Sequence, residues 1–136
     1  MVWTICYGKR IAARDLVRRA GLRPGAEVLD VGCGRGLLLI EAARRLGGGR
    51  AVGLDLWNAE DLSGNNRAAA QSNAICEGVA DRVTLVDGDM RCMPFEDDSF
   101  DVVLSSMAVH NIYEPAGRKQ ALAEIIRVLR PGGAWH

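Results

Sequence analysis

Residues 28–36 read Val-Leu-Asp-Val-Gly-Cys-Gly-Arg-Gly, and this stretch decides the fold of the chain. Its apolar start predicts a buried strand, and three glycines at every second position then lead into an apolar helical stretch over residues 37–46. Glycine leaves no Cβ in the way of a ligand, and the amides of the following helix point out of its N-terminal end. Asp30, near the carboxyl end of the strand, is expected to face the same space. The sequence therefore predicts a ligand-binding corner, with a tight strand-to-helix connection as the alternative.

The spacing of the glycines distinguishes between two kinds of ligand. A dinucleotide-binding turn reads G-x-G-x-x-G, with its third glycine after a two-residue gap. Here the glycines follow G-x-G-x-G, and an acidic residue stands two positions before the first of them. A nicotinamide-dependent dehydrogenase stays an alternative, but this spacing argues against it.

Apolar patterns predict that helices and strands alternate along the rest of the chain. Helical periodicity marks residues 9–20, residues 63–77 and the stretch from Pro115 to the break at Pro131. Buried strands are expected at residues 51–55, 82–86 and 100–106. The expected fold is an α/β, doubly wound, mostly parallel sheet with helices on both faces.

Asp55 ends the second predicted strand, 19 residues beyond Gly36. In a right-handed strand-helix-strand unit the two strands are adjacent and parallel, so their carboxyl ends share one edge of the sheet. Asp55 is therefore expected to face the same crevice as the glycines, where a carboxylate can accept both hydroxyls of a ribose. A helix cap is the alternative role for Asp55. Leu56 and Trp57 follow directly and could pack on a flat base, although Trp57 could equally be a cover of the sheet edge.

Composition is that of one soluble globular domain. The 136 residues are 49% hydrophobic and 25% charged, which allows one core. Basic and acidic residues balance at 17 each, so no net field attracts a polyanion and nucleic acid is not an expected partner. The four cysteines are scattered without a metal-ligand spacing, which predicts no metal site and an intracellular, cytoplasmic protein. The apolar start at residues 1–6 is too short to span a membrane.

Four motifs in order resemble the class I S-adenosylmethionine (SAM) dependent methyltransferases, in particular those that act on small molecules. They are the glycine corner, the G-D-x turn at residues 88–90, the phrase M-P-F-x-D-x-S-F-D-V-V at 93–103 and the phrase E-I-x-R-V-L-R-P-G-G at 124–133. The resemblance covers residues 24–133. It implies a Rossmann-like fold, SAM as the cofactor and one domain over residues 1–136, with an N-terminal helical segment at 1–22.

The resemblance also implies roles for individual residues. Asp30 and the glycine backbone would hold the methionine part of SAM, Asp55 the ribose, and Asp89 the adenine, although Asp89 could be a turn acid with no ligand. The backbone after the fourth strand would lie near the sulfonium. The expected cofactor-binding residues are Asp30, Gly32, Cys33, Gly34, Gly36, Asp55, Leu56, Asp89, Met90, Ser105 and Ser106.

The implied activity is methyl transfer from SAM to a small-molecule acceptor. His110 lies in the loop where related enzymes bind the acceptor, so it is the candidate catalytic base, with a loop-holding role as the alternative. A second hypothesis is a truncated, inactive fragment that binds SAM or a partner.

The C-terminus departs from the family pattern. Relatives complete a seven-stranded sheet, whereas here three residues follow Gly133 and the last strands are missing. The apolar fourth strand is therefore expected to lose most of its neighbour. An exposed edge of this kind favours self-association.

Overall fold

The computed structural model describes residues 2–57, 67–105, 108–109 and 112–136, with side chains from Arg10 onward. Five parallel strands form one sheet in the order β3-β2-β1-β4-β5. Their bounds are β1 Glu27–Val31, β2 Arg50–Asp55, β3 Val83–Asp87, β4 Phe100–Ser105 and β5 Leu129–Trp135. The strand order reverses beside β1, which is where open α/β sheets bind ligands.

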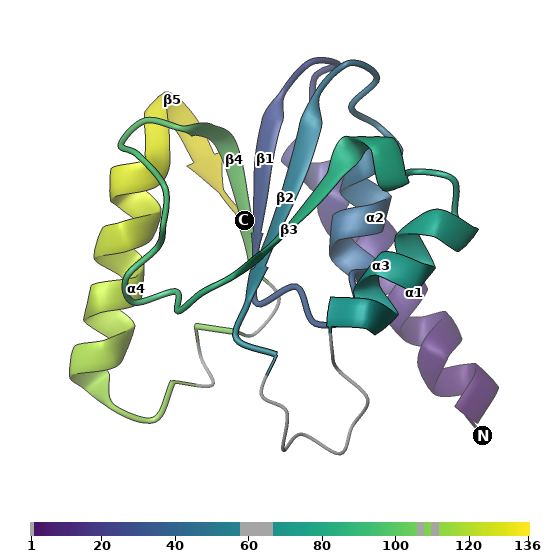
Figure 1. Ribbon diagram of the computed structural model, residues 1–136, viewed down its shortest axis with the longest axis horizontal. Coiled ribbons are helices and arrows are strands. Elements are labelled where there is room, and N and C mark those ends of the chain that lie inside the picture. Colours follow the sequence, from purple (N-terminus) through teal and green to yellow (C-terminus); the bar gives the residue numbers. More distant parts are fainter. Residues whose placement is uncertain (1, 58–66, 106–107, 110–111) are drawn as a thin grey trace.

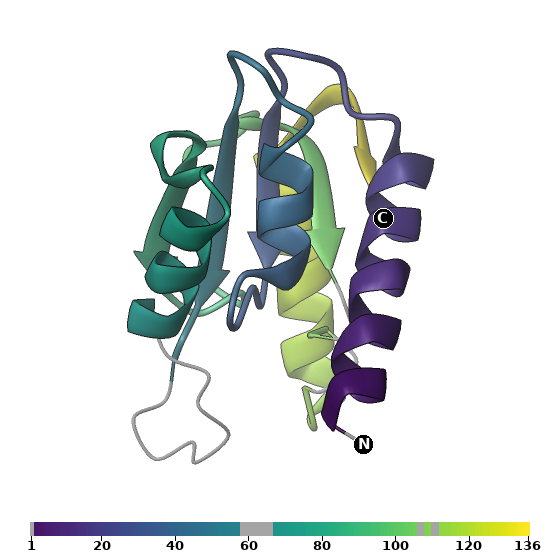
Figure 2. The same ribbon diagram turned by 90° about the vertical axis from the view of Figure 1, so that its right-hand side faces the viewer.

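Four α-helices cover the two faces of this sheet (Figure 1). They are α1 Val2–Ala20, α2 Leu37–Ala43, α3 Arg67–Cys76 and α4 Pro115–Val128, and a short 3-10 helix spans Ala80–Arg82. Figure 2 shows α1, α2 and α3 side by side over one face, and α4 covers the other. The predicted α/β fold with helices on both faces is confirmed. In the described ranges, none of the helices is long and apolar enough to cross a lipid bilayer.

Alternation along the strands divides the core between the two faces. Val28 of β1 packs with Val17 of α1 and Leu39 of α2. Its neighbour Leu29 points the other way and packs with Ile125 of α4. Because β1 is buried on both sides, its sequence is apolar without alternation, as expected for a central parallel strand.

Most predicted boundaries hold within a residue or two. The α-helix α2 ends at Ala43, earlier than predicted, because Arg45 and Leu46 donate to carbonyls three residues back and tighten the chain into a turn. The first helix begins at Val2, ahead of the predicted start at residue 9. The expected N-cap of α3 at Ser63 lies outside the described residues.

The prediction that β4 loses most of its neighbour is wrong. Gly132, at φ 82°, lets the chain bulge after α4 and return beside β4, so that Ala134 and Trp135 pair with Val102 and Val103. The edge of the sheet is therefore β5, whose side chains are exposed from residue 131 onward. Self-association through that edge stays a prediction.

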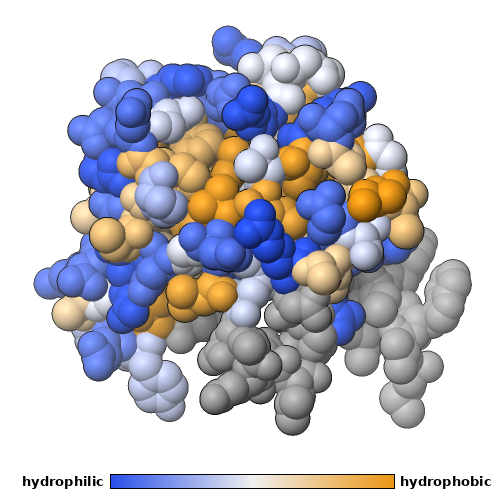
Figure 3. Space-filling model, in the orientation of Figure 1, coloured by the Kyte–Doolittle hydropathy of each residue, from blue (hydrophilic) through white to orange (hydrophobic). Residues whose placement is uncertain are grey.

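The other edge of the sheet is β3, and its outward surface is partly apolar. Figure 3 shows apolar residues gathered over the middle of this face, where β3 runs, with hydrophilic residues around them. Val83 and Val86 of β3 are half-buried. The apolar edge is short, since β3 has five residues and its end at Asp87 is charged.

Gly53 in β2 allows the glycine corner to pack closely on the sheet. A Cβ at this position would lie 2.7 Å from both the Cys33 Sγ and the Leu39 Cδ2. Since real Cβ atoms do not approach other atoms so closely, a side chain here would push the corner and α2 away from β2. Gly53 was not singled out from the sequence, because nothing in the local pattern shows what lies above a strand.

We expect Gly53→Ala to lower the free energy of unfolding by about 1–3 kcal/mol, the usual cost of overpacking a core. Urea denaturation of the purified chain measures this change. Gly48→Ala is the matched control, because a Cβ there meets nothing within 4 Å. Equal losses in the two variants would contradict the proposed contact.

Candidate functional site

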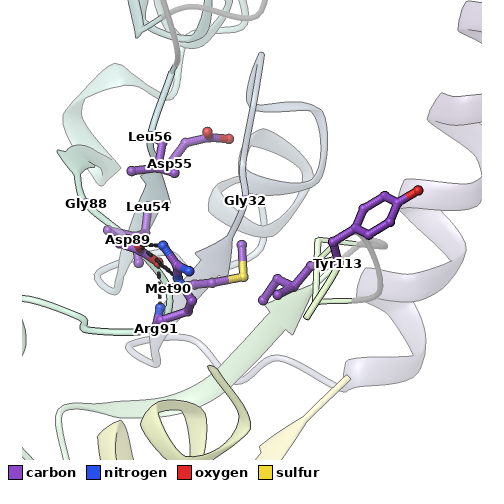
Figure 4. Close-up of a pocket in the computed structure, with 10 residues that line it drawn as sticks. Gly32, Leu54, Asp55, Leu56, Gly88, Asp89, Met90, Arg91 and Tyr113 are labelled. Carbon is purple, nitrogen blue, oxygen red and sulfur yellow. Dashed lines mark hydrogen bonds and ion pairs between the residues drawn. The ribbon is translucent and has the colours of Figure 1, made fainter. Parts of the chain in front are cut away.

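Among the described residues, two cavities at the carboxyl edge of the sheet share Gly32 in their linings. The first, here called the β2–β3 cavity, has a volume of about 270 Å³ (Figure 4). Its lining includes Gly32, Leu54, Asp55, Leu56, Gly88, Asp89, Met90, Arg91, Ile112 and Tyr113. The second, here called the α1 cavity, has about 440 Å³ and lies between α1 and the glycine corner. Its lining includes Ala12, Ala13, Leu16, Asp30, Gly32, Cys33, Gly34, Arg35, Leu37 and Leu38.

The three glycines of the corner all adopt the left-handed conformation. Their φ angles are 73° at Gly32, 52° at Gly34 and 88° at Gly36, a region that residues with a Cβ seldom enter. A Cβ on Gly32 would also overlap the side chain of Ala108. The sequence predicted glycine here because a ligand needs space that a side chain would fill. The positive φ angles require glycine for a second, independent reason.

Asp55 connects the end of β2 to the glycine corner. Its Oδ2 accepts a hydrogen bond from the Gly34 amide at 2.8 Å, and its Oδ1 accepts one from the Trp57 amide at 3.0 Å. The Trp57 indole in turn donates to the Gly34 carbonyl at 2.8 Å. The prediction that Asp55 faces the crevice of the glycines is confirmed, since it lines the β2–β3 cavity and contacts the corner directly.

A second side chain holds the same corner from α3. The Asn73 amide donates to the Arg35 carbonyl at 3.0 Å. Two successive carbonyls of the corner, those of Gly34 and Arg35, are thus bound by side chains from elements that follow β1 in the chain. This helix carries two amide side chains, Gln71 and Asn73, and the sequence did not show that one of them reaches the corner.

Asp30 is buried beneath the glycine corner. It is 1% exposed, and neither carboxylate oxygen has a partner within the described part of the chain. Burial, together with the nearby charge of Asp55, raises the pKa of Asp30 to about 8, and the nearby Leu39 amide offsets only part of this rise. A buried carboxyl with open acceptor positions beside a cavity is a place for a hydrogen-bond donor or a cation.

Asp89 lines the β2–β3 cavity and is bound there by Arg91 (Figure 4). The Arg91 Nη2 donates to Oδ2 at 2.6 Å, and its backbone amide donates to Oδ1 at 2.9 Å. These hydrogen bonds hold the pKa of Asp89 below its usual value, so the carboxylate is charged. The role of Arg91 was not predicted from the sequence, because its pairing with Asp89 depends on the shape of the turn.

The remaining predicted residues are placed as follows. Leu56 and Met90 line the β2–β3 cavity. The Cys33 thiol is buried, would contact a Cβ on Gly53, and has a pKa raised by that burial. Ser105 ends β4 beside Val31, and Ser106 and His110 lie outside the described residues.

The three predicted acids therefore gather at one edge of the sheet. Asp55 and Asp89 line one cavity, Asp30 lines the other, and Gly32 borders both. Sequence reasoning missed the wall that α1 contributes through Ala12, Ala13 and Leu16, since an amphipathic helix does not reveal which element it covers.

Comparison with known proteins places this geometry in a family. Residues 28–133 match the model of a family described as a methyltransferase domain. A demethylmenaquinone methyltransferase from Symbiobacterium thermophilum is 36% identical over 123 residues, which are 90% of this chain and 45% of the relative. The ubiquinone/menaquinone biosynthesis C-methyltransferase UbiE from Roseobacter denitrificans is 38% identical over 111 residues, covering 82% of this chain and 41% of the relative.

A solved structure agrees with these relatives. Geranyl diphosphate methyltransferase in complex with SAM superposes with a TM-score of 0.75 at 26% identity, covering 93% of this chain and 47% of that one. The chain spans less than half the length of all three proteins. The sequence match over most of the chain and the shared fold together show that the chain belongs to the methyltransferase domain family.

Proposed function

We propose that the two cavities that share Gly32 bind SAM, and that the protein transfers a methyl group from it to a small-molecule acceptor. The observation that carries this proposal is Asp30, a buried carboxyl beside the α1 cavity whose two oxygens have no hydrogen-bond partner among the described residues. SAM consists of an adenosine half and a methionine half, and the methionine half carries an ammonium group. Two cavities that meet at a residue without a side chain fit such a molecule, with the ammonium against Asp30.

Each half of the ligand has matching groups in the chain. Asp55 accepts from the ribose hydroxyls with the lone pairs that Gly34 and Trp57 leave open. Asp89 accepts from the adenine amino group, and Leu56 and Met90 flank the base. Asp30 and the backbone of Gly32, Cys33, Gly34 and Gly36 hold the methionine half, with Ser105 and Ser106 near the sulfur.

The chain's part in the reaction is to hold and orient. When bound, SAM supplies a methyl group on a positively charged sulfur, which is already a good leaving group. The acids at the edge of the sheet hold this cation in one place. Orientation of two reactants is worth up to about 7–11 kcal/mol in the best cases. His110 remains the candidate for removing a proton from the acceptor.

The proposed class of methyl acceptor, a small molecule, is based on the names of the relatives. One is named for demethylmenaquinone, one for ubiquinone/menaquinone biosynthesis and one for geranyl diphosphate. All three names point to small molecules rather than to protein or nucleic acid. The balanced charge of this chain agrees with that class, since it carries no net field that would attract a polyanion.

Titration calorimetry tests the cofactor directly. We expect SAM and S-adenosylhomocysteine to bind and NAD not to bind. Asp55→Ala removes charge-assisted hydrogen bonds and should weaken S-adenosylhomocysteine binding by about 1.5–3 kcal/mol. Asp87→Ala is the matched control, because Asp87 pairs with Asp55 in the sheet register but is exposed and bound to Arg67. Binding of NAD in place of SAM, or equal losses in the two variants, would contradict the assignment.

The pKa of Asp30 predicts how stability depends on pH. In the folded chain this carboxyl keeps its proton up to a pH of about 8, whereas in the unfolded chain it ionises near the ordinary value of 3.8. Between these two values the unfolded chain binds fewer protons, so stability falls as the pH rises from about 4 to 8 and then levels off. The slope from this one residue is about 1 kcal/mol per pH unit. Urea denaturation across this pH range measures it.

Asp30→Asn is the control for that slope, because the amide does not titrate. The variant should lose the Asp30 contribution to the pH dependence. A carbon-13 titration of the Asp30 carboxyl in the unaltered chain gives the same answer without a substitution. A midpoint near pH 4 would contradict the raised pKa.

Proton release on binding connects Asp30 to the ligand. At pH 7 the carboxyl is protonated in the free chain, and an ammonium group beside it favours the ionised form. Binding of S-adenosylhomocysteine should therefore release close to one proton per ligand. Calorimetry in buffers of different ionisation enthalpy counts these protons. Release that persists unchanged in Asp30→Asn would assign it to another group.

A further inference from the structure

Trp57 has an unusual backbone for a residue with a large side chain. Its φ angle is 41°, in the left-handed region that residues with a Cβ seldom adopt. In the ranges that the structure describes, Asp98 is the other non-glycine residue with a positive φ, and it lies in a surface turn. A conformation of this kind persists where surrounding contacts hold it, and such residues are common at ligand sites.

Trp57 donates two of the three hydrogen bonds that form a closed ring with Asp55 and Gly34. The Trp57 amide donates to Asp55, the Asp55 carboxylate accepts from the Gly34 amide, and the Gly34 carbonyl accepts from the Trp57 indole. The three distances are 3.0, 2.8 and 2.8 Å. The indole is half-buried and packs against the core beneath the corner. Both backbone polar groups of Gly34 are thus hydrogen-bonded, the amide to Asp55 and the carbonyl to Trp57.

We propose that Trp57 is a positioning residue of the SAM site, whose indole N–H fixes the glycine corner and the Asp55 carboxylate in the geometry that receives the ligand. This inference rests on the proposed function. Trp57 acts through Gly34 and Asp55, since the indole N–H is already bound to the Gly34 carbonyl.

The glycines make such a residue necessary. A segment with three glycines in five residues has many accessible backbone conformations, and each must be lost when a ligand orders the segment. A contact that selects one conformation beforehand raises the fraction of molecules ready to bind, and apparent affinity rises by the same fraction. Asp55 alone holds the amide side of Gly34, so the indole supplies the second restraint.

Trp57→Phe tests the proposal, because it keeps an aromatic ring and removes the N–H. We expect the Kd of S-adenosylhomocysteine to rise about five- to tenfold, the effect of one buried hydrogen bond. Trp135→Phe is the matched control, because Trp135 lies on the edge strand β5 and is 47% exposed. The control should bind within twofold of the unaltered chain.

A pair of tryptophan analogues separates the hydrogen bond from packing. Site-specific incorporation of 3-benzothienylalanine at position 57 replaces the N–H by sulfur at nearly constant shape, whereas 5-fluorotryptophan keeps the N–H. The sulfur analogue should bind as weakly as Trp57→Phe, and the fluorinated analogue should restore binding. This comparison also holds if Trp57→Phe proves poorly folded.

Hydrogen exchange gives a readout in the absence of ligand. If the indole fixes the corner, the Gly34 amide should exchange faster in the sulfur analogue than in the fluorinated one, while amides of β1 exchange at equal rates. A purely structural role of the ring would slow or speed exchange equally in both analogues. Combining Trp57→Phe with Asp55→Asn should weaken binding by less than the product of the single effects, because both act on Gly34.

The outcomes distinguish this inference from the proposed function. If the unaltered chain binds no S-adenosylhomocysteine, the proposed function fails and the inference falls with it. If the unaltered chain binds and the sulfur analogue binds equally well, the inference alone is overturned.

Discussion

The hydrogen bond between the Gly34 amide and the Asp55 carboxylate joins two neighbouring strand ends, and the site depends on it. It acts together with the backbone hydrogen bonds from the Gly32 and Cys33 amides to the Leu54 carbonyl, and it restrains a segment whose glycines impose no conformation of their own. With it, the corner has one shape, and two cavities form on either side of Gly32. The parallel pairing of β1 with β2 makes this contact possible, because it brings both carboxyl ends to one edge.

The same edge of the sheet brings three carboxyl groups together, and their charges would repel one another in the folded chain. Burial and the nearby charge of Asp55 raise the pKa of Asp30, so this carboxyl keeps its proton at neutral pH. Asp89 has the opposite environment, since Arg91 holds it in the charged form. Two carboxyls of one site therefore differ in protonation because one is desolvated and the other is paired. The arrangement favours a ligand with positive charge near Asp30 and hydrogen-bond donors near Asp55 and Asp89.

Much of this could be predicted from the sequence. The apolar runs of β1, β2 and β4 indicated buried parallel strands, and strand adjacency then placed Asp55 beside the glycines. Contacts that depend on the course of a turn could not be predicted. The pairing of Arg91 with Asp89 and the reach of Trp57 to Gly34 both arise from backbone angles that no residue pattern specifies. The bulge at Gly132 was missed for the same reason, since Pro-Gly-Gly was interpreted as the break that ends the helix and leaves three residues for the fifth strand, rather than as a detour within that strand.

The junction at Gly32 has a consequence for selectivity. A molecule that fills both cavities behaves as two weak ligands on a short tether, because occupancy of one cavity raises the local concentration of the other half to the millimolar range or above. The intact molecule then outcompetes its separate fragments without any additional contact. A nucleoside or an amino acid, which fills one cavity at a time, therefore competes poorly with a molecule that spans both.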